Sequence, residues 1–180
     1  MKSAASLPAT PGSESGDIFE NTVRVRYAET DQMGVVYHGH YYMYFEVGRV
    51  EYMRSRGAAY KEMETHDDCY IVVAESHCRH LRPARYDDLL RIRTRVVQAR
   101  RRTIRFAYEI LNDANGELLA TGETLHVICN REGRPKALPE KYRGLFPLSE
   151  NGIPGDTSAV KPLTPDSETE INPSAMRPRS

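Results

Sequence analysis

The fold is decided by residues 26–57, which read RYAETDQMGVVYHGHYYMYFEVGRVEYMRSRG. The first part of this stretch, up to residue 38, has the composition of a turn-rich loop and carries the carboxylate Asp31. The second part predicts a helix over residues 39–56 that has almost no charge on most of its surface. A carboxylate just before a buried helix start is chemically useful, because free backbone N–H groups and the helix dipole favour negative charge there.

The expected helix is apolar over much more than a single stripe. One face carries residues at helical spacing, namely Tyr41, Phe45, Gly48 and Tyr52. Further apolar residues widen that face: Tyr44, Val47, Val50 and Met53. A helix that is apolar on most sides is expected to be a central one, wrapped by other structure.

The residues that follow this helix predict strands. Alternating apolar and polar residues indicate strands at 21–28, 70–81, 88–97, 103–112 and 118–130, with a short helix at 58–65. One long helix followed by consecutive antiparallel strands predicts an α+β domain whose sheet curls around the helix. The outward faces of such a sheet would be bare and partly apolar, so self-association is expected.

Length and composition limit the classes of protein. The 180 residues suit one domain, expected at residues 21–148, between disordered tails at residues 1–20 and 149–180 that are rich in Pro and Ser. No apolar run approaches the roughly 20 residues that a membrane-spanning helix needs, so no transmembrane segment is expected. The formal net charge of +0 gives no electrostatic case for a nucleic-acid partner.

The cysteines do not predict a disulfide framework, and the His pair alone does not predict a metal site. Cys69, Cys78 and Cys129 are odd in number and irregularly spaced, which is typical of reduced thiols. His38 and His40 could ligate a metal only with a third ligand that no pattern indicates, so neither metal nor another cofactor is expected. The N-terminus lacks the apolar core of a secretory signal, and together with the thiols this predicts a cytoplasmic protein.

Asp31 has two interpretations. In the functional one, the loop folds back over the helix start, where free N–H groups stabilise an oxyanion while the carboxylate attacks or activates water. That arrangement suits acyl transfer, with His38 as a polar neighbour. In the structural one, Asp31 caps the helix or closes an Asx turn, and spacing alone favours this alternative.

Arginines cluster near the expected strand ends, at Arg79, Arg82 and Arg85 and again at Arg100, Arg101 and Arg102. They are either ordinary solvated charges at turns or a landing site for a phosphorylated ligand, whose geometry suits guanidinium groups. The residues alone leave both possibilities open. The G-x-S-x-G elbow and the Gly-rich phosphate loop are both absent from the sequence.

Two motifs carry a resemblance to a known family. YAETDQMGVVYHGHY at residues 27–41 and YFEVGR at residues 44–49 strongly resemble the 4-hydroxybenzoyl-CoA thioesterase family, including the bacterial acyl-CoA thioesterases associated with the Tol-Pal system. The segments RPARYDDL (82–89), ATGET (120–124) and RPKALP (134–139) match the family in the same order. The resemblance covers roughly residues 21–146.

The resemblance implies a hotdog fold, a curved antiparallel sheet around one central helix, in subunits that form homodimers and often homotetramers. It implies hydrolysis of an acyl-CoA to a free acid and CoA. The family's catalytic aspartate falls on Asp31, and the backbone N–H that polarises the thioester carbonyl falls on His38, with Tyr37 and Gly39 beside it. The family usually has Asn where this chain has His40, which leaves substrate preference open.

The CoA nucleotide of this family usually lies against basic residues of a neighbouring subunit, which points to Arg82 or to Arg100 and Arg101. Two other functions remain as alternatives. One is a hotdog hydratase or dehydratase, which usually needs a His/carboxylate pair across a dimer interface. The other is a non-catalytic acyl-CoA-binding module. The Asp-x-x-Gly loop favours the thioesterase over both.

Overall fold

The computed structural model describes residues 18–146, which form a five-stranded sheet and several helices. In chain order the elements are β1 (Phe19–Arg24), the 3-10 helix η1 (Tyr27–Glu29), α1 (His40–Ser55), α2 (Tyr60–Asp67), β2 (Tyr70–His80), β3 (Leu89–Ala99), β4 (Thr103–Asn112), β5 (Leu118–Cys129) and α3 (Glu140–Arg143). The expected tails at residues 1–20 and 149–180 lie outside the described residues, apart from residues 18–20. No helix within residues 18–146 is long and apolar enough to span a bilayer.

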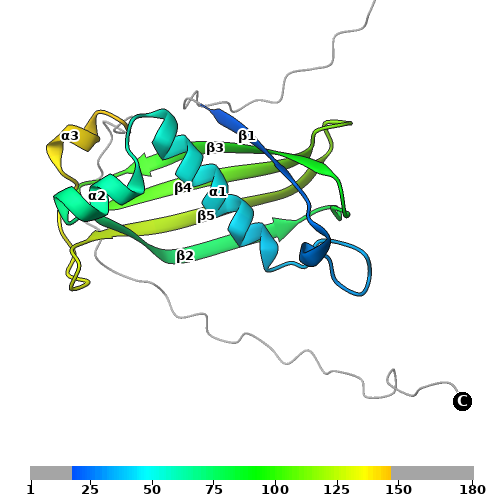
Figure 1. The fold of residues 1–180 in the computed structure, drawn as a ribbon. Coiled ribbons are helices and arrows are strands. Elements are labelled where there is room, and N and C mark those ends of the chain that lie inside the picture. Colours follow the sequence, from blue (N-terminus) through cyan, green and yellow to red (C-terminus); the bar gives the residue numbers. More distant parts are fainter. Residues whose placement is uncertain (1–17, 147–180) are drawn as a thin grey trace, which may run out of the picture. The chain divides into compact units, whose positions relative to one another are not determined.

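The sheet is antiparallel throughout, with the strand order β1-β3-β4-β5-β2. β3, β4 and β5 follow one another in the chain and pair as neighbours, as their alternating patterns predicted. β1 and β2 take the two edges, although only the loop and the helices separate them in the chain. In the chain, α1 comes between the two edge strands β1 and β2. In space, it lies across one face of the sheet (Figure 1).

Alternation along the middle strands separates a buried face from a charged one. The predicted inward residues of β3 and β4 are buried, namely Leu90, Ile92, Thr94, Val96, Ile104, Phe106, Tyr108 and Ile110. The opposite face carries ion pairs such as Arg93 Nε to Glu20 Oε1, at 2.6 Å, and Arg105 Nη1 to Glu123 Oε2, at 3.3 Å. The predicted inward faces of these strands are thus confirmed, since a side-chain period of two sends alternate residues to opposite faces.

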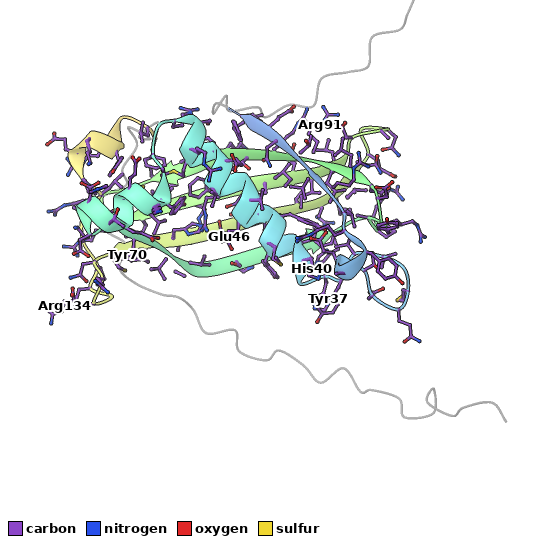
Figure 2. All side chains as sticks on the ribbon, viewed as in Figure 1. Tyr37, His40, Glu46, Tyr70, Arg91 and Arg134 are labelled. Carbon is purple, nitrogen blue, oxygen red and sulfur yellow. The ribbon has the colours of Figure 1, made fainter. Side chains whose placement is uncertain are left out.

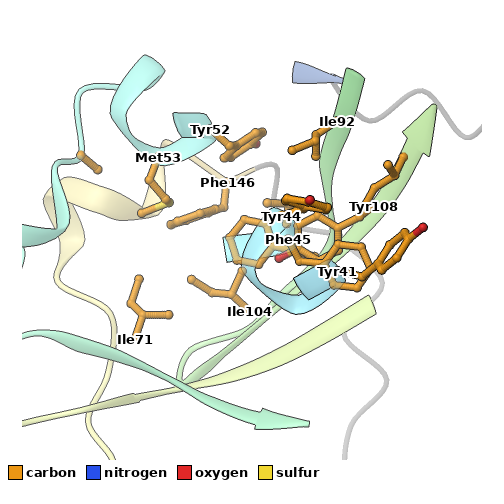
Figure 3. Packing of buried hydrophobic residues seen from close by; sticks show 14 of the residues in the cluster. Tyr41, Tyr44, Phe45, Tyr52, Met53, Ile71, Ile92, Ile104, Tyr108 and Phe146 are labelled. Atoms are coloured by element: carbon orange, nitrogen blue, oxygen red, sulfur yellow. The ribbon is translucent and has the colours of Figure 1, made fainter. Parts of the chain in front are cut away.

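Two glycines let α1 approach the sheet closely. A Cβ on Gly48 of α1 would lie 2.5 Å from Thr94 Oγ1 and 2.8 Å from Ile92 Cγ2. A Cβ on Gly122 of β5 would lie 2.2 Å from the ring of Phe45. That ring stacks on Tyr108 with centroids 4.6 Å apart and an interplanar angle of 14°, within the aromatic core shown in Figure 3. The helix is thereby held against β3, β4 and β5 by contacts that leave no room for another methyl group.

The first strand differs from the expectation at both ends. β1 begins at Phe19, inside the expected tail, because the Phe19 ring packs edge-on against Tyr52 at 6.3 Å. It ends at Arg24, whereas the alternation predicted a strand to residue 28 with Tyr27 facing inward. Tyr27 is instead exposed in η1, since a reciprocal capping box between Arg26 and Glu29 turns the chain away from the sheet.

α1 is also less enclosed than its composition predicted. The face with helical spacing is buried, including Tyr41, Phe45 and Tyr52. On the other side Tyr42, Met43 and Val47 are exposed, although all three are apolar or aromatic. Among residues 18–146, the helix therefore has one covered face and one apolar face that no other element covers.

A chain of polar side chains crosses the core between α1 and the sheet. Arg49 of α1 places Nη1 2.7 Å from Nδ1 of the fully buried His126, whose Nε2 lies 2.7 Å from Thr124 Oγ1. Thr124 also hydrogen-bonds the Tyr108 hydroxyl at 2.8 Å. A guanidinium only donates hydrogen bonds, so the imidazole must present an unprotonated nitrogen to it. Burial and the Arg49 charge lower the pKa of His126 to about 3.

We predict that Gly48→Ala lowers the free energy of unfolding by about 1–3 kcal/mol, because the new methyl group must displace Thr94 or Ile92. Gly144→Ala is the control, since a Cβ there meets no atom within 4 Å. Denaturant unfolding of both variants measures the difference. Equal stability of the two variants would contradict the close approach of α1 to the sheet.

We also predict that buried His126 makes the protein acid-sensitive. The pKa in the folded state is lowered to about 3, whereas an unfolded histidine titrates near its usual 6.5. Above pH 6.5 the histidine is neutral in both states, and the free energy of unfolding has its full value. Below that pH the free energy of unfolding declines by about 1.4 kcal/mol per pH unit, because only the unfolded state gains a proton. In urea unfolding between pH 7 and pH 4, the free energy of unfolding should depend less on pH for His126→Gln than for the wild type. His66→Gln, on the exposed surface of α2, should keep the wild-type slope.

Candidate active site

The loop that carries Asp31 is a closed hairpin. The Asp31 N–H donates to the Val35 carbonyl, and the Gly34 N–H donates to the Asp31 carbonyl, both at 2.9 Å. Gly34 has a φ of 71°, a left-handed conformation that favours glycine. Asp31 Oδ1 accepts a hydrogen bond from the Met33 N–H at 2.8 Å, which is an Asx turn. The residue therefore closes its own turn and does not cap α1.

The remaining chemistry of Asp31 lies in its second oxygen. Oδ2 accepts no hydrogen bond from any residue in the described part of the chain, and no cation within that part forms an ion pair with the carboxylate. The side chain is half-buried. One oxygen is thus fixed by the turn, while the other is free to act on a bound molecule.

Two unpaired backbone donors lie where the chain enters α1. The His40 N–H donates to the Tyr37 carbonyl at 2.9 Å, and the Tyr41 N–H donates to the His38 carbonyl at 3.3 Å. The N–H groups of His38 and Gly39 donate to no group among residues 18–146. No side chain caps the helix, and no acidic residue occupies its first turn. The positive end of the helix dipole and two free donors are therefore available to an anionic oxygen.

The hairpin is tied directly to this helix start. The Tyr37 N–H donates to the Glu29 carbonyl at 2.9 Å, and Thr30 forms an isolated bridge with Val36. The Val36 N–H donates to the Ala84 carbonyl, which fixes the same segment to the chain beyond β2. Figure 2 shows Tyr37 and His40 at the N-terminal end of α1. Asp31, Tyr37, His38 and Gly39 thus belong to one folded segment that leads into α1.

Aromatic and imidazole rings surround the helix start. The rings of Tyr37 and His38 have centroids 4.2 Å apart, and those of Tyr41 and His80 are 4.6 Å apart. Burial lowers the pKa of His80, and the nearby His38 lowers it further. His80 comes from the end of β2, and only the tertiary structure brings it here. Cys78 lies beside it, and burial raises the pKa of this thiol to about 11, which favours the neutral thiol over the thiolate.

Glu29 is a buried carboxylate beneath the hairpin that sequence reasoning missed. Its side chain is 3% exposed and accepts hydrogen bonds from the Tyr44 hydroxyl, the Arg26 backbone and the Arg26 guanidinium. Burial by itself would raise the pKa of Glu29, but these donors outweigh it, and the pKa is lowered. The signal in the sequence was the spacing Arg26-x-x-Glu29, which is that of a capping box.

The arginines proposed for CoA binding lie at two different ends of the sheet. Arg82 follows β2 on the side of the Asp31 hairpin and pairs with Glu117 at 2.5 Å. Arg100 and Arg101 lie in the β3–β4 turn, where the Leu138 N–H donates to the Arg101 carbonyl. The strand register places that turn at the same end of the sheet as Tyr70, the first residue of β2. Within one chain, the structure therefore separates Arg100 and Arg101 from the hairpin.

Comparisons with known proteins agree with this fold. A family model described as the thioesterase-like superfamily matches residues 25–146. The acyl-CoA thioester hydrolase YbgC of Escherichia coli O6:H1 is 34% identical over 131 residues, which are 72% of this chain and 96% of that protein.

Solved structures give the same result. The DHNA-CoA thioesterase of Staphylococcus aureus has a TM-score of 0.66 and 31% identity, over 71% of this chain and 84% of its own. The protein TT1821 of Thermus thermophilus has a TM-score of 0.66 and 35% identity, over 70% and 95%. The five-stranded antiparallel sheet is that of these hotdog-fold neighbours, and the resemblance drawn from the motifs is confirmed. The chain belongs to the thioesterase-like superfamily.

Proposed function

We propose that the protein is an acyl-CoA thioesterase, which hydrolyses an acyl-CoA to a free carboxylic acid and CoA. The observation that carries the proposal is that one folded segment holds a carboxylate oxygen of Asp31 and two N–H groups at the start of α1, all without a hydrogen-bond partner among residues 18–146. Catalysed hydrolysis of a thioester uses both elements, because a nucleophile or base acts at the carbonyl carbon and hydrogen-bond donors stabilise the carbonyl oxygen. Family membership and the YbgC relative support the same substrate class.

In the proposed reaction, the thioester carbonyl oxygen accepts hydrogen bonds from the N–H groups of His38 and Gly39. These donors and the helix dipole stabilise the negative charge that develops on that oxygen. Asp31 Oδ2 either attacks the carbonyl carbon or removes a proton from an attacking water. In the first route CoA leaves as its thiolate, and water then hydrolyses the acyl–aspartyl anhydride. In the second the acid forms directly. Both routes consume one water and release one thiol.

We assign the CoA nucleotide to basic side chains at the surface. Arg82 lies on the side of the hairpin and could contact a phosphate once it releases Glu117. Arg100 and Arg101 are too far along the sheet to serve the hairpin of their own chain, so they would reach a CoA only from a neighbouring subunit. The exposed ring of Tyr37, beside His38, is placed to contact the acyl or pantetheine part.

We propose that the chain forms a homodimer, with tetramers as a further step. β2 is an edge strand of eleven residues, and it contains the exposed Val72 and Val73. The exposed apolar face of α1 offers Tyr42, Met43 and Val47. A second copy would pair with the open edge at β2 and cover the apolar face of α1. Open edges and apolar patches of proteins are commonly covered in this way.

In this proposal α1 is the central helix of a hotdog unit, around which the sheet curves, and residues 21–148 are the thioesterase domain. A cytoplasmic location is the expectation that follows from three free thiols, because an oxidising compartment would expose them to pairing.

Asp31→Asn should lower the rate of thiol release by about 10²–10⁴-fold, because the amide can neither attack nor accept a proton. The assay follows free CoA with a thiol-reactive chromophore, across short-chain, long-chain and aromatic acyl-CoAs. The control is Asp68→Asn, the same change at an exposed residue near Arg131, which should keep the wild-type rate. Wild-type turnover by Asp31→Asn would refute the assignment, and loss of enoyl-CoA absorbance without thiol release would favour a hydratase.

Val73→Glu should convert dimers to monomers, since a charge on the free edge of β2 opposes pairing with a second copy. Its side chain is 49% exposed in the isolated chain, so folding should tolerate the change. Light scattering coupled to size-exclusion chromatography measures the mass. Val97→Glu, at a partly exposed position of β3 inside the sheet, should keep the wild-type mass. An unchanged mass for Val73→Glu would exclude β2 as the contact.

A further inference from the structure

We propose that Glu29 is a positioning residue, which holds the Asp31 hairpin against the start of α1 through Tyr44. The proposal deepens the function above and rests on the role assigned to Asp31. Glu29 itself is nine-tenths or more buried and so cannot reach a substrate in place of Asp31. Its part is to set where the free oxygen of Asp31 lies relative to the N–H groups of His38 and Gly39.

Three attachments meet at Glu29. Its Oε2 accepts a hydrogen bond from the Tyr44 hydroxyl at 2.9 Å, which ties it to α1 itself. The same oxygen accepts from the Arg26 N–H at 2.9 Å, and Oε1 accepts from Nε and Nη2 of Arg26 at 2.8 and 2.6 Å, which ties it to the chain after β1. Its backbone carbonyl accepts from the Tyr37 N–H at 2.9 Å, directly before the free donors.

These attachments act on both halves of the candidate site at once. Glu29 lies two residues before Asp31, so a shift of its side chain moves the base of the hairpin. Its carbonyl holds Tyr37, so the same shift moves the segment that presents the His38 and Gly39 donors. Tyr44 belongs to α1, and the close packing at Gly48 and Phe45 fixes α1 on the sheet. The bond between Glu29 and Tyr44 therefore anchors the whole segment to a rigid helix.

A carboxylate suits this position better than a neutral acceptor. Each of its oxygens accepts two hydrogen bonds, and charge-assisted bonds are shorter and stronger than neutral ones. A mispositioned hairpin would retain acyl-CoA binding but lose the alignment needed in the transition state, where about 1 Å can cost about 10²-fold in rate. The signature of positioning is therefore a loss of kcat at nearly constant KM.

Tyr44→Phe tests the proposal, because it removes one hydroxyl and leaves the ring in place. The matched control is Tyr108→Phe, which also removes a buried hydroxyl hydrogen bond, to Thr124 at 2.8 Å, but on the sheet and without contact to the hairpin. We expect about a tenfold lower kcat for Tyr44→Phe with KM within about twofold, and an unchanged kcat for Tyr108→Phe. Glu29→Gln should lower kcat further, since the amide nitrogen cannot accept the two bonds that one carboxylate oxygen accepts.

A second measurement does not depend on the chemistry. Hydrogen–deuterium exchange of the amides of Asp31 and Tyr37, which bond Val35 and Glu29, should accelerate in Tyr44→Phe and Glu29→Gln but not in Tyr108→Phe. Exchange in β3 and β4 should stay at the wild-type rate in the Tyr44 and Glu29 variants.

The outcomes separate the two proposals. If Asp31→Asn is inactive while Tyr44→Phe matches the wild type in kcat and exchange, the positioning role is overturned and the proposed function stands. An equal loss of kcat in Tyr44→Phe and Tyr108→Phe would also overturn it, because that result indicates general destabilisation. If Asp31→Asn is active but exchange accelerates only in the Tyr44 and Glu29 variants, the attachment is supported and the assigned chemistry fails.

Discussion

The close contact between α1 and the inner face of the sheet is the constraint on which the rest depends. Gly48 and Gly122 remove the two side chains that would keep the helix away, and Phe45 fills the space against Tyr108. A core packed this tightly is rigid, so the direction and the N-terminal end of α1 are fixed together. The hairpin with Asp31 therefore meets a helix start that cannot drift relative to β3, β4 and β5.

Two buried ionisable groups serve that arrangement in opposite ways. Glu29 remains charged because hydrogen bonds from Arg26 and Tyr44 outweigh the cost of burial. His126 remains neutral because burial and the Arg49 charge both disfavour its protonated form. The first fixes a loop at the edge of the core and the second fixes a polar chain within it. Hydrogen-bond donors therefore decide the charge state of Glu29, whereas burial and a neighbouring positive charge decide that of His126.

Much of the fold followed from local patterns. The inward residues of β3 and β4 and the bounds of β4 agree with the alternation, because a two-residue period leaves a half-buried strand only one register. Tyr27 was predicted wrongly, since alternation continues past the capping box of Arg26 and Glu29 that ends the strand. Glu29 was overlooked because burial of a carboxylate depends on donors such as Tyr44, fifteen residues further along.

By itself, the sequence determined the element order, the apolar face of α1, the Asp-x-x-Gly hairpin and the family resemblance. These are local properties, set by side-chain periodicity and turn chemistry. Only the tertiary structure decided that Asp31 closes an Asx turn with one oxygen free, that His80 joins the helix start, and that Arg82 and Arg101 lie at different ends of the sheet. The reason is that strand order and register bring together residues far apart in the chain, and no local pattern encodes that distance.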